Sequence, residues 1–241
     1  MELQGQRVLV TGATAGIGQE TAKLFARRGA SVVITGRDTV RGAQTVAAIE
    51  AEGGRAEFIA ADLIDIESVR RLAEQAGDVD VLVNNAAVHT FGPTLEQGVD
   101  SFDTTFDVNV RAPFFLTAAL LPKMIARGSG AIVNVSSMGA SIGVPYGPVA
   151  AAAKAAVESF TRSWAAAFGA NGIRVNAVAP GPTRTATGAL GDGLERLGSA
   201  TLLGRTADPS EIAEAIVFLA SPHASYLTGT TVAVDGGYSA I

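Results

Sequence analysis

The sequence predicts a doubly wound α/β fold, with a seven-stranded parallel sheet and helices on both of its faces. Short β-rich runs alternate with longer helical patterns from one end of the 241-residue chain to the other. Several runs, such as VLV, VVI and IVNV, are continuously apolar, as expected of strands that are covered on both faces. No linker, low-complexity tract or shift in composition divides the chain, so we expect residues 1–241 to form one domain.

The expected strands are Arg7–Val10, Ser31–Thr35, Ala56–Ala60, Val81–Asn84, Ala131–Val135, Arg174–Val178 and Thr231–Val234. After the first strand, apolar residues recur at helical spacing from Ile17 to Arg28, and Gly29 closes this helix. A later helix begins at Pro209-Ser210, where the sequence SEIAEAIVFLAS turns an apolar stripe toward a core. Right-handed crossovers carry each helix over the sheet, so this alternation predicts parallel strands.

One long stretch, at about residues 186–204, has no regular pattern and is rich in glycine. An insertion of this length inside a compact domain is typical of a mobile substrate lid, and disorder is the alternative. Its apolar side chains suit an apolar substrate, or they hold the lid shut; they are Ala189, Leu190, Leu194, Leu197 and Leu202.

The composition excludes several classes of function. A net charge of -5 and a pI near 5.1 argue against a nucleic-acid or anionic-membrane surface. The absence of cysteine excludes disulfides, thiolate metal sites and a cysteine nucleophile. No apolar run approaches the roughly 18 residues that span a bilayer, and the first residues do not resemble a signal peptide. We therefore expect a soluble cytoplasmic protein.

Three glycines, Gly12, Gly16 and Gly18, join the first strand to the first helix, with Ile17 between the last two. Glycine allows positive φ and lets the backbone approach a pyrophosphate at a helix N-terminus. Any tight joint between strand and helix could use three glycines, so the composition of the turn is weak evidence alone. Its place after the first strand favours a Rossmann-type nucleotide site.

The end of the second strand bears on the choice of cofactor. Gly36 leaves space there, and the planar cation of Arg37 suits the 2′-phosphate of NADP. The alternative is that Arg37 is a solvated loop charge and that Asp38 caps the next helix. We favour NADP(H), and Asp38 keeps NAD(H) possible. After the third strand, Asp62 could accept a hydrogen bond from the adenine amino group, with Leu63 beside it, or it could belong to a helix N-terminus.

Five motifs occur in an order that covers nearly the whole chain. They are TGATAGIG, NNAA at 84–87, IVNVSS at 132–137, a lysine in an Ala-rich helix, and RVNAVAPGPTRT at 174–185; LTGTTVAVDGG follows at 227–237. By these motifs the chain resembles the short, single-domain branch of the short-chain dehydrogenase/reductase family, and within it the 3-oxoacyl-carrier-protein reductases. The resemblance implies NAD(P)-dependent hydride transfer between an alcohol and a ketone.

The catalytic tetrad of that family is Asn, Ser, Tyr and Lys, and the resemblance matches Asn109, Ser137 and Lys154 to three of them. The serine hydroxyl stabilises the oxygen that becomes negative as its carbon accepts hydride. The tyrosine delivers the proton, and the ammonium lowers its pKa. The lysine also holds the nicotinamide ribose, and Asn109 would anchor a water that leads protons to it. The alternatives are a strand end for Ser137, a local helix irregularity for Asn109 and a surface charge for Lys154.

Ala150 stands where the family has its tyrosine, four residues before Lys154. Loss of a general acid costs roughly 10² to 10⁴ in rate. Three explanations remain, in this order: an engineered replacement, a natural member that uses Tyr146 or His89 as donor, and a non-redox protein that binds a dinucleotide.

The resemblance implies further contacts and an assembly. Asn85 and Ala86 would line the cofactor pocket, and the residues expected to meet the nicotinamide carboxamide are Pro180, Gly181, Thr183 and Thr185. No metal ion is expected. The Ala-rich helix from about Ala150 to Phe168 would pair across a dimer interface, and the VAVDGG end would form the second interface of a homotetramer. The substrate is a small carbonyl or alcohol; fatty-acyl, sugar, steroid and polyketide carbonyls all fit.

Overall fold

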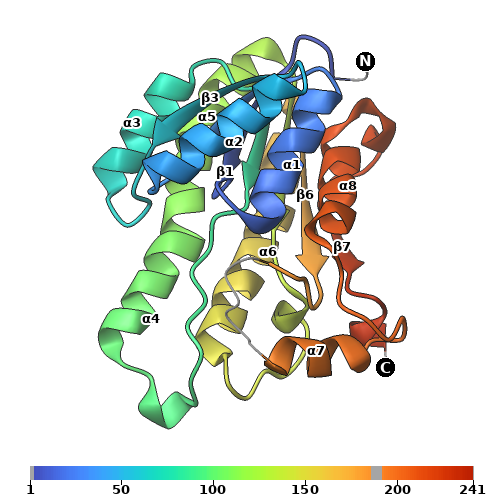
Figure 1. The fold of residues 1–241 in the computed structure, drawn as a ribbon. Helices are drawn as coiled ribbons and strands as arrows, with labels where there is room; N and C mark the ends of the chain where they lie inside the picture. Colours follow the sequence, from blue (N-terminus) through green and yellow to red (C-terminus); the bar gives the residue numbers. More distant parts are fainter. Residues whose placement is uncertain (1–2, 186–191, 241) are drawn as a thin grey trace.

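The computed structural model describes residues 3–185 and 192–240, and its centre is a seven-stranded parallel sheet (Figure 1). The strands are β1 Arg7–Thr11, β2 Ser31–Gly36, β3 Arg55–Ala60, β4 Val81–Asn84, β5 Gly130–Val135, β6 Ile173–Pro180 and β7 Thr231–Val234. They lie in the order β3-β2-β1-β4-β5-β6-β7, and every neighbouring pair is parallel. The fold class predicted from the alternation of elements is confirmed.

The order of strands reverses between β1 and β4. The chain leaves β1 toward β2 on one side, and returns to pair β4 with the other side of β1. The loops after these two strands therefore diverge at the carboxyl edge of the sheet, which is where open α/β sheets bind ligands.

Helices cover both faces of the sheet (Figure 1). One layer holds α1 Gly16–Arg27, α2 Thr39–Ala51 and α8 Pro209–Ala220. The other holds α3 Ile66–Ala76, α5 Ala112–Arg127 and α6 Pro148–Phe168. The helix α4, Val99–Phe106, runs into α5 through a π-helical segment, Asp107–Arg111. No helix among the described residues is long and apolar enough to cross a membrane.

Successive strand residues point to opposite layers, which gives the protein two cores. Val8 and Val10 of β1 pack with Phe25 of α1, whereas Leu9 between them packs with Leu116 of α5. All five side chains are at most 1 % exposed. Burial of each stabilises the fold by roughly 1.5–3 kcal/mol, which explains why these strands are apolar without interruption.

The predicted strands agree with the observed ones to within two residues at either end. The stretch at 186–204, which the sequence predicts to be irregular, differs from that prediction in part. Asp192–Ser199 forms the helix α7, whose sequence DGLERLGS has leucines three residues apart. Residues 186–191, which include Ala189 and Leu190 of the expected lid, lie outside the described residues.

Candidate active site

The glycine turn packs closely against the loop that follows β4. Gly12 and Gly16 have φ values of 64° and 56°, which side chains rarely adopt. A Cβ added to Gly12 would lie 2.8 Å from Ala86 Cα, and one added to Gly18 would lie 2.4 Å from Asn85 Nδ2. The turn is tight because the loop after β4 approaches it so closely that a Cβ on Gly12 or Gly18 would clash.

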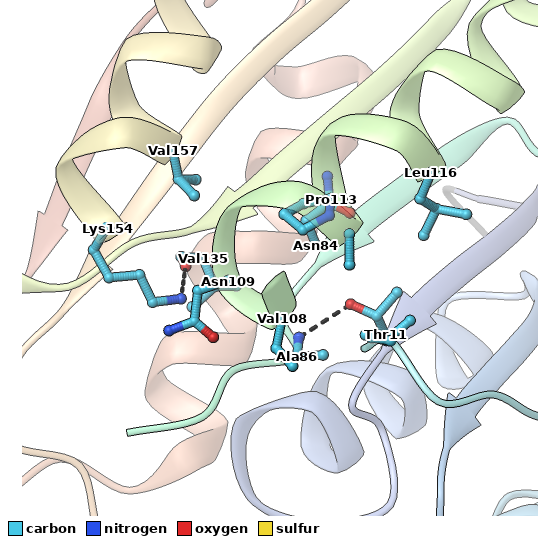
Figure 2. Close-up of a pocket in the computed structure, with 12 residues that line it drawn as sticks. Thr11, Asn84, Ala86, Val108, Asn109, Pro113, Leu116, Val135, Lys154 and Val157 are labelled. Carbon is cyan, nitrogen blue, oxygen red and sulfur yellow. Dashed lines mark hydrogen bonds between the residues drawn. The ribbon is translucent and has the colours of Figure 1, made fainter. Parts of the chain in front are cut away.

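Thr11 and Asn85 hold these two segments together. The Thr11 hydroxyl accepts hydrogen bonds from the backbone N–H groups of Asn85 and Ala86, each at 3.0 Å. Figure 2 shows the bond from Ala86. In return, Asn85 Nδ2 donates to the carbonyls of Thr11 and Gly12 at 2.8 and 3.1 Å. The structure thus places Asn85 and Ala86 against the turn.

The N-terminus of α1 fits an anion. The helix begins at Gly16, its N-cap Ala15 makes no side-chain hydrogen bond, and its first turn has no acidic residue. The first N–H groups of a helix have no partner within the helix, and the helix dipole favours negative charge at this end. A pyrophosphate therefore fits this turn, while the Ile17 side chain packs on the core. A Cβ on Gly16 would lie 3.2 Å from Thr185 Cγ2, so the segment after β6 also reaches the turn.

The other residues of that segment lie nearby. Pro180 ends β6, and a Cβ added to Gly181 would lie 2.5 Å from Asp235 Cα, so glycine is required by close packing. The Thr183 hydroxyl donates to the Gly181 carbonyl at 2.9 Å, and Thr183 bridges to Ala207.

Two charged residues, Arg37 and Asp38, follow β2, and they differ in whether the charge is paired. Asp38 is the N-cap of α2, where its carboxylate accepts from the Arg41 N–H at 3.0 Å and from Arg41 Nε at 2.7 Å. These bonds hold the pKa of Asp38 below its usual value. Arg37 is exposed and has no hydrogen bond or ion pair with any residue in the described ranges. Both parts of the alternative are therefore present, because Asp38 caps α2 and Arg37 is an exposed loop charge.

Asp62 and Leu63 lie at the end of β3, on the same edge of the sheet. Asp62 is exposed, and its Oδ1 accepts from the Ile64 N–H at 3.1 Å. The N-cap of α3 is Asp65, so capping does not require Asp62.

Ser137 lies two residues beyond the end of β5, in extended conformation. It caps the short 3₁₀ helix Met138–Ala140, where its Oγ accepts from the Gly139 N–H at 3.1 Å. That bond uses an oxygen lone pair, so the hydroxyl hydrogen is available to an oxygen of a substrate.

Lys154 is buried in α6, with 5 % of its surface exposed, which excludes the surface-charge alternative. Its Nζ donates to the Val135 carbonyl at 2.7 Å, at the end of the strand that leads to Ser137 (Figure 2). Burial lowers the pKa of this amine to about 8. A positive charge is thus held immediately beneath the strand end that carries the serine.

Asn109 lies in the middle of the π-helical segment, so the irregularity named as its alternative is present. Its Oδ1 accepts from the Val88 N–H and its Nδ2 donates to the Val88 carbonyl, both at 2.9 Å. The side chain therefore fixes the loop after β4. Both Asn109 and Lys154 line one small cavity (Figure 2), and single π turns inside α-helices are frequent at functional sites.

Ala150 lies in the first turn of α6, four residues before Lys154, on the same side of the helix. Tyr146 is 70 % exposed in the preceding loop, and its phenol makes no hydrogen bond with the part of the chain that the structure describes. His89 stacks on Phe91, with ring centroids 6.3 Å apart. Desolvation and the Lys154 charge lower the pKa of His89 to about 4, so the ring is neutral at neutral pH.

Comparison with known proteins agrees with this geometry. The family model described as Enoyl-(Acyl carrier protein) reductase matches residues 12–239. The chain belongs to the short-chain dehydrogenase/reductase family. It is an enzyme of this family of NAD(P)-dependent oxidoreductases.

Three relatives show the extent of the likeness. A cis-4-hydroxycyclohexanecarboxylate dehydrogenase from Sinomonas cyclohexanicum is 42 % identical over 241 residues, which cover 97 % of this chain and 96 % of that one. A solved short chain dehydrogenase/reductase family protein is 53 % identical, with a TM-score of 0.94 and complete coverage of both chains. A blue fluorescent protein from a metagenomic library, in complex with NADPH, is 37 % identical with a TM-score of 0.93, over 99 % of this chain and 100 % of that one.

Within this short-chain dehydrogenase/reductase, sequence reasoning missed Thr11 and Val88, which fix the loop after β4 through their contacts with Asn85 and Asn109. The sequence holds a signal for Thr11, because it ends a buried strand and a buried hydroxyl needs a hydrogen-bond partner. Val88 acts through its backbone, which leaves no signal in the sequence.

Proposed function

We propose that this enzyme binds NADP(H) and transfers hydride between the nicotinamide and the carbonyl carbon of a ketone, or the reverse from a secondary alcohol, at a rate that Ala150 greatly reduces. The observation that carries the proposal is the buried Lys154 ammonium bonded to Val135, two residues before Ser137. A lysine in a buried position needs a functional reason, since burial of its charge is costly.

Each part of the cofactor has residues that would hold it. The N–H groups at the start of α1 would bind the pyrophosphate, as in other helix N-termini. The remaining cofactor contacts that we propose are Gly12, Gly16, Ile17, Gly18, Arg37, Asp62, Leu63, Asn85, Ala86, Lys154, Pro180, Gly181, Thr183 and Thr185. When bound, the nicotinamide supplies or accepts the hydride.

NADP(H) is the preferred cofactor in this proposal, and NAD(H) is the alternative. The free guanidinium of Arg37 suits a 2′-phosphate, whereas the Asp38 carboxylate that would repel it is paired with Arg41. The NADPH complex of the metagenomic relative supports the same choice.

Titration of NADPH and NADH against Arg37→Gln tests the preference for NADP(H). We expect the variant to bind NADPH roughly tenfold or more weakly, because a charge-assisted hydrogen bond is lost, and to bind NADH as before. Arg55→Gln is the matched control, because Arg55 is the first residue of β3, at the opposite edge of the sheet from Arg37, which follows the last residue of β2. Equal loss for both cofactors would contradict the assignment.

The protein side chains act on the substrate oxygen. Ser137 donates its hydroxyl hydrogen to this oxygen and stabilises the negative charge that develops there. The Lys154 charge stabilises the same region. A tyrosine at position 150 would stand on the Lys154 side of α6 and give up its proton, and alanine has none to give. Water must then supply the proton, which costs roughly 10² to 10⁴ in rate.

The origin of Ala150 has three explanations, and we propose an engineered replacement. The helix start, the lysine and the serine around it are intact, as a single substitution would leave them. A natural member with another donor is the first alternative, but Tyr146 is solvent-exposed and His89 is neutral at neutral pH. A non-redox dinucleotide-binding protein is the second alternative, and binding alone would not need Ser137, Asn109 and Lys154 together.

Deuterium transfer tests the redox function even when turnover is slow. The protein is incubated for a long time with NADPH carrying deuterium at the reactive carbon and with cyclic and linear ketones, because the Sinomonas relative is named for a cyclic secondary alcohol. We expect deuterium at the carbinol carbon of the product by mass spectrometry, and much less with Ser137→Ala. Bound NADPH without any transfer would establish the non-redox alternative.

We further propose one catalytic domain over residues 1–241, with a substrate lid at about 186–204, a cytoplasmic location and a homotetramer or homodimer. The support for assembly is an aromatic group on α5 and α6, in which Phe114 packs on Phe115, Phe160 and Trp164 with ring centroids 5.3 to 6.1 Å apart. Phe114 and Phe115 remain exposed on the single chain. A patch of this kind is suited to a second copy.

A further inference from the structure

Two aromatic side chains, His89 and Phe91, lie together in the segment that follows β4, and we call this pair the aromatic wall. Their rings are nearly parallel, at 14°, and the ring centroids are 6.3 Å apart. That distance is close to the roughly 6.6 Å between alternate residues of an extended chain, whose side chains point to the same side. Both side chains are exposed, Phe91 by 49 %, so the wall presents aromatic surface to whatever binds there.

The segment that carries the aromatic wall is held at both ends, although it has no regular secondary structure (Figure 1). On one side of the wall, the Asn109 side chain bonds to both backbone groups of Val88. On the other side, the Gly92 N–H donates to the Tyr146 carbonyl at 2.9 Å, in the loop before α6.

Thr90, between the two rings, anchors the middle of the segment on α4. The buried Thr105 hydroxyl donates to the Ser101 carbonyl at 2.7 Å, so the Thr90 hydroxyl must be the donor in its 2.8 Å bond with Thr105. Alternate side chains of an extended segment point to opposite sides, so this bond turns His89 and Phe91 away from α4. The wall is thus held in place before any ligand binds, and little freedom is lost on binding.

The aromatic wall borders the place where the substrate carbonyl would lie. A Cβ added to Gly139 would lie 3.5 Å from Ser137 Oγ and 3.2 Å from Val144 Cγ2. A Cβ added to Gly147 would lie 3.3 Å from Val144 Cγ1 and 3.8 Å from Phe91 Cδ1. One side chain, Val144, therefore reaches from beside the serine hydroxyl to beside the Phe91 ring.

The wall is also close to the functional end of α6. Gly147, which Phe91 approaches, is the N-cap of this helix, and Ala150 lies in its first turn. Desolvation and the charge of Lys154 lower the pKa of His89 to about 4, so the imidazole lies within electrostatic reach of the ammonium and is neutral at neutral pH.

The polar side chains beside the wall are already engaged within the protein. The Thr90 hydrogen goes to Thr105, and the Asn109 amide bonds to Val88 through both its oxygen and its nitrogen. The wall itself offers a polyhydroxylated substrate only the nitrogens of one neutral imidazole, whereas each buried hydroxyl would need a partner. A flat ring, by contrast, stacks well on an aromatic ring, with centroids about 4.5–7 Å apart.

We propose that the aromatic wall determines specificity: Phe91 and His89 stack on a flat, unsaturated ring next to the substrate carbonyl, so that the enzyme selects aryl ketones over straight-chain ketones. In the reverse direction the same wall selects aryl carbinols. This inference rests on the proposed function, because it takes the carbonyl to lie beside Ser137.

Acetophenone and 2-octanone, which have equal numbers of non-hydrogen atoms, test the inference. Each ketone is titrated into the protein saturated with NADP⁺, and binding is followed by NMR of the ketone. The oxidised cofactor cannot reduce a ketone, so no turnover disturbs the measurement. We expect acetophenone to bind roughly tenfold more tightly, although 2-octanone is the more apolar of the two, because only the flat ring can stack. Equal affinities, or a preference for 2-octanone, would overturn the proposal.

Variants show whether the preference comes from the wall. Phe91→Ala should bind acetophenone roughly tenfold more weakly, and Phe91→Leu, which keeps an apolar side chain without a ring, should also lose the preference. Tyr226→Ala is the matched control, because Tyr226 is fully exposed and precedes β7, at the opposite edge of the sheet. A preference that survives in Phe91→Leu would overturn the proposal, and this variant decides if Phe91→Ala does not fold.

Binding of NADP⁺ is measured in the same samples, which separates this inference from the proposed function. Cofactor binding without a preference between the ketones would overturn the inference and leave the proposed function standing. A protein that does not bind NADP⁺ would contradict the proposed function. The two ketones are then titrated into the protein alone, and the same comparison decides whether the wall selects a ring.

Discussion

Lys154 carries a positive charge in a buried position, where desolvation disfavours the charged form. Its pKa in the folded protein is about 8, below its ordinary value of 10.5, so the unfolded chain binds more protons between these two pH values. Stability therefore rises as the pH increases from about 8 toward 10.5, and at neutral pH the buried charge lowers the free energy of unfolding.

Lys154→Met should remove this pH dependence, because methionine fills similar space without a charge. At about pH 7 we expect the free energy of unfolding to rise by roughly 1–3 kcal/mol, after the loss of the hydrogen bond to Val135. Urea unfolding at about pH 7 and about pH 10 measures both effects. Lys123→Met is the control, since Lys123 is exposed and pairs with Asp78. A destabilised methionine variant with an unchanged pH slope would contradict this account.

At the scale of single residues, only part of the site could be predicted from the sequence. Ser137 and Lys154 were proposed from the family motifs, and the structure places the Lys154 ammonium on the Val135 carbonyl, two residues before Ser137. The free state of Arg37 could not, because it depends on Arg41 turning back to Asp38. The buried hydrogen bond from Asn84 Nδ2 to Asn134 Oδ1 could not be predicted either, since it joins residues 50 positions apart in sequence.

Among the elements, the joint between β1 and α1 is the proposed site of the cofactor pyrophosphate. Gly16→Ala should weaken NADPH binding strongly, because the residue has positive φ and its new Cβ would press on Thr185 at 3.2 Å, in front of the helix N-terminus. Gly53→Ala is the matched control, as Gly53 also has positive φ but nothing lies within 4 Å of an added Cβ.

Both alanine variants should lose a similar free energy of unfolding, about 1–2 kcal/mol, through backbone strain. Only Gly16→Ala should lose affinity in a fluorescence titration with NADPH. If both variants bind NADPH as the parent does, the glycine turn is not the pyrophosphate site.

The boundaries of the strands could be predicted from the sequence, because buried strands consist of apolar residues. The strands are apolar because both faces are covered, and turns with glycine or proline mark their ends. A local irregularity at Asn109 is among the alternatives that the sequence predicts, and the π-helical segment is that irregularity, whereas the two bonds to the Val88 backbone leave no signal in the sequence. The helix α7 could not be predicted because Gly193 and Gly198, which weaken a helix, lie within its short amphipathic run.

At the scale of the whole molecule, the exposed aromatic side chains Phe114 and Phe115 on α5 predict association. Phe115→Glu should shift the protein toward monomer in light scattering coupled to size-exclusion chromatography, because a buried carboxylate without a partner is costly at an interface. Val40→Glu, on the exposed surface of α2, should leave the assembly unchanged. A monomeric parent protein, or an unchanged assembly of Phe115→Glu, would contradict the proposed interface.

As a whole, we propose, the molecule is a reductase that lacks its proton donor, because position 150 is alanine. The most direct test compares NADPH oxidation in the presence of a ketone by the parent chain, Ala150→Tyr and Ala150→Phe. Phenylalanine supplies the ring without the hydroxyl, so it separates the proton from the packing. We expect the tyrosine variant to be faster than the parent by roughly 10² to 10⁴, and the phenylalanine variant to remain as slow as the parent. A parent chain as fast as its tyrosine variant would show that another donor acts, and the account given for Ala150 would be wrong.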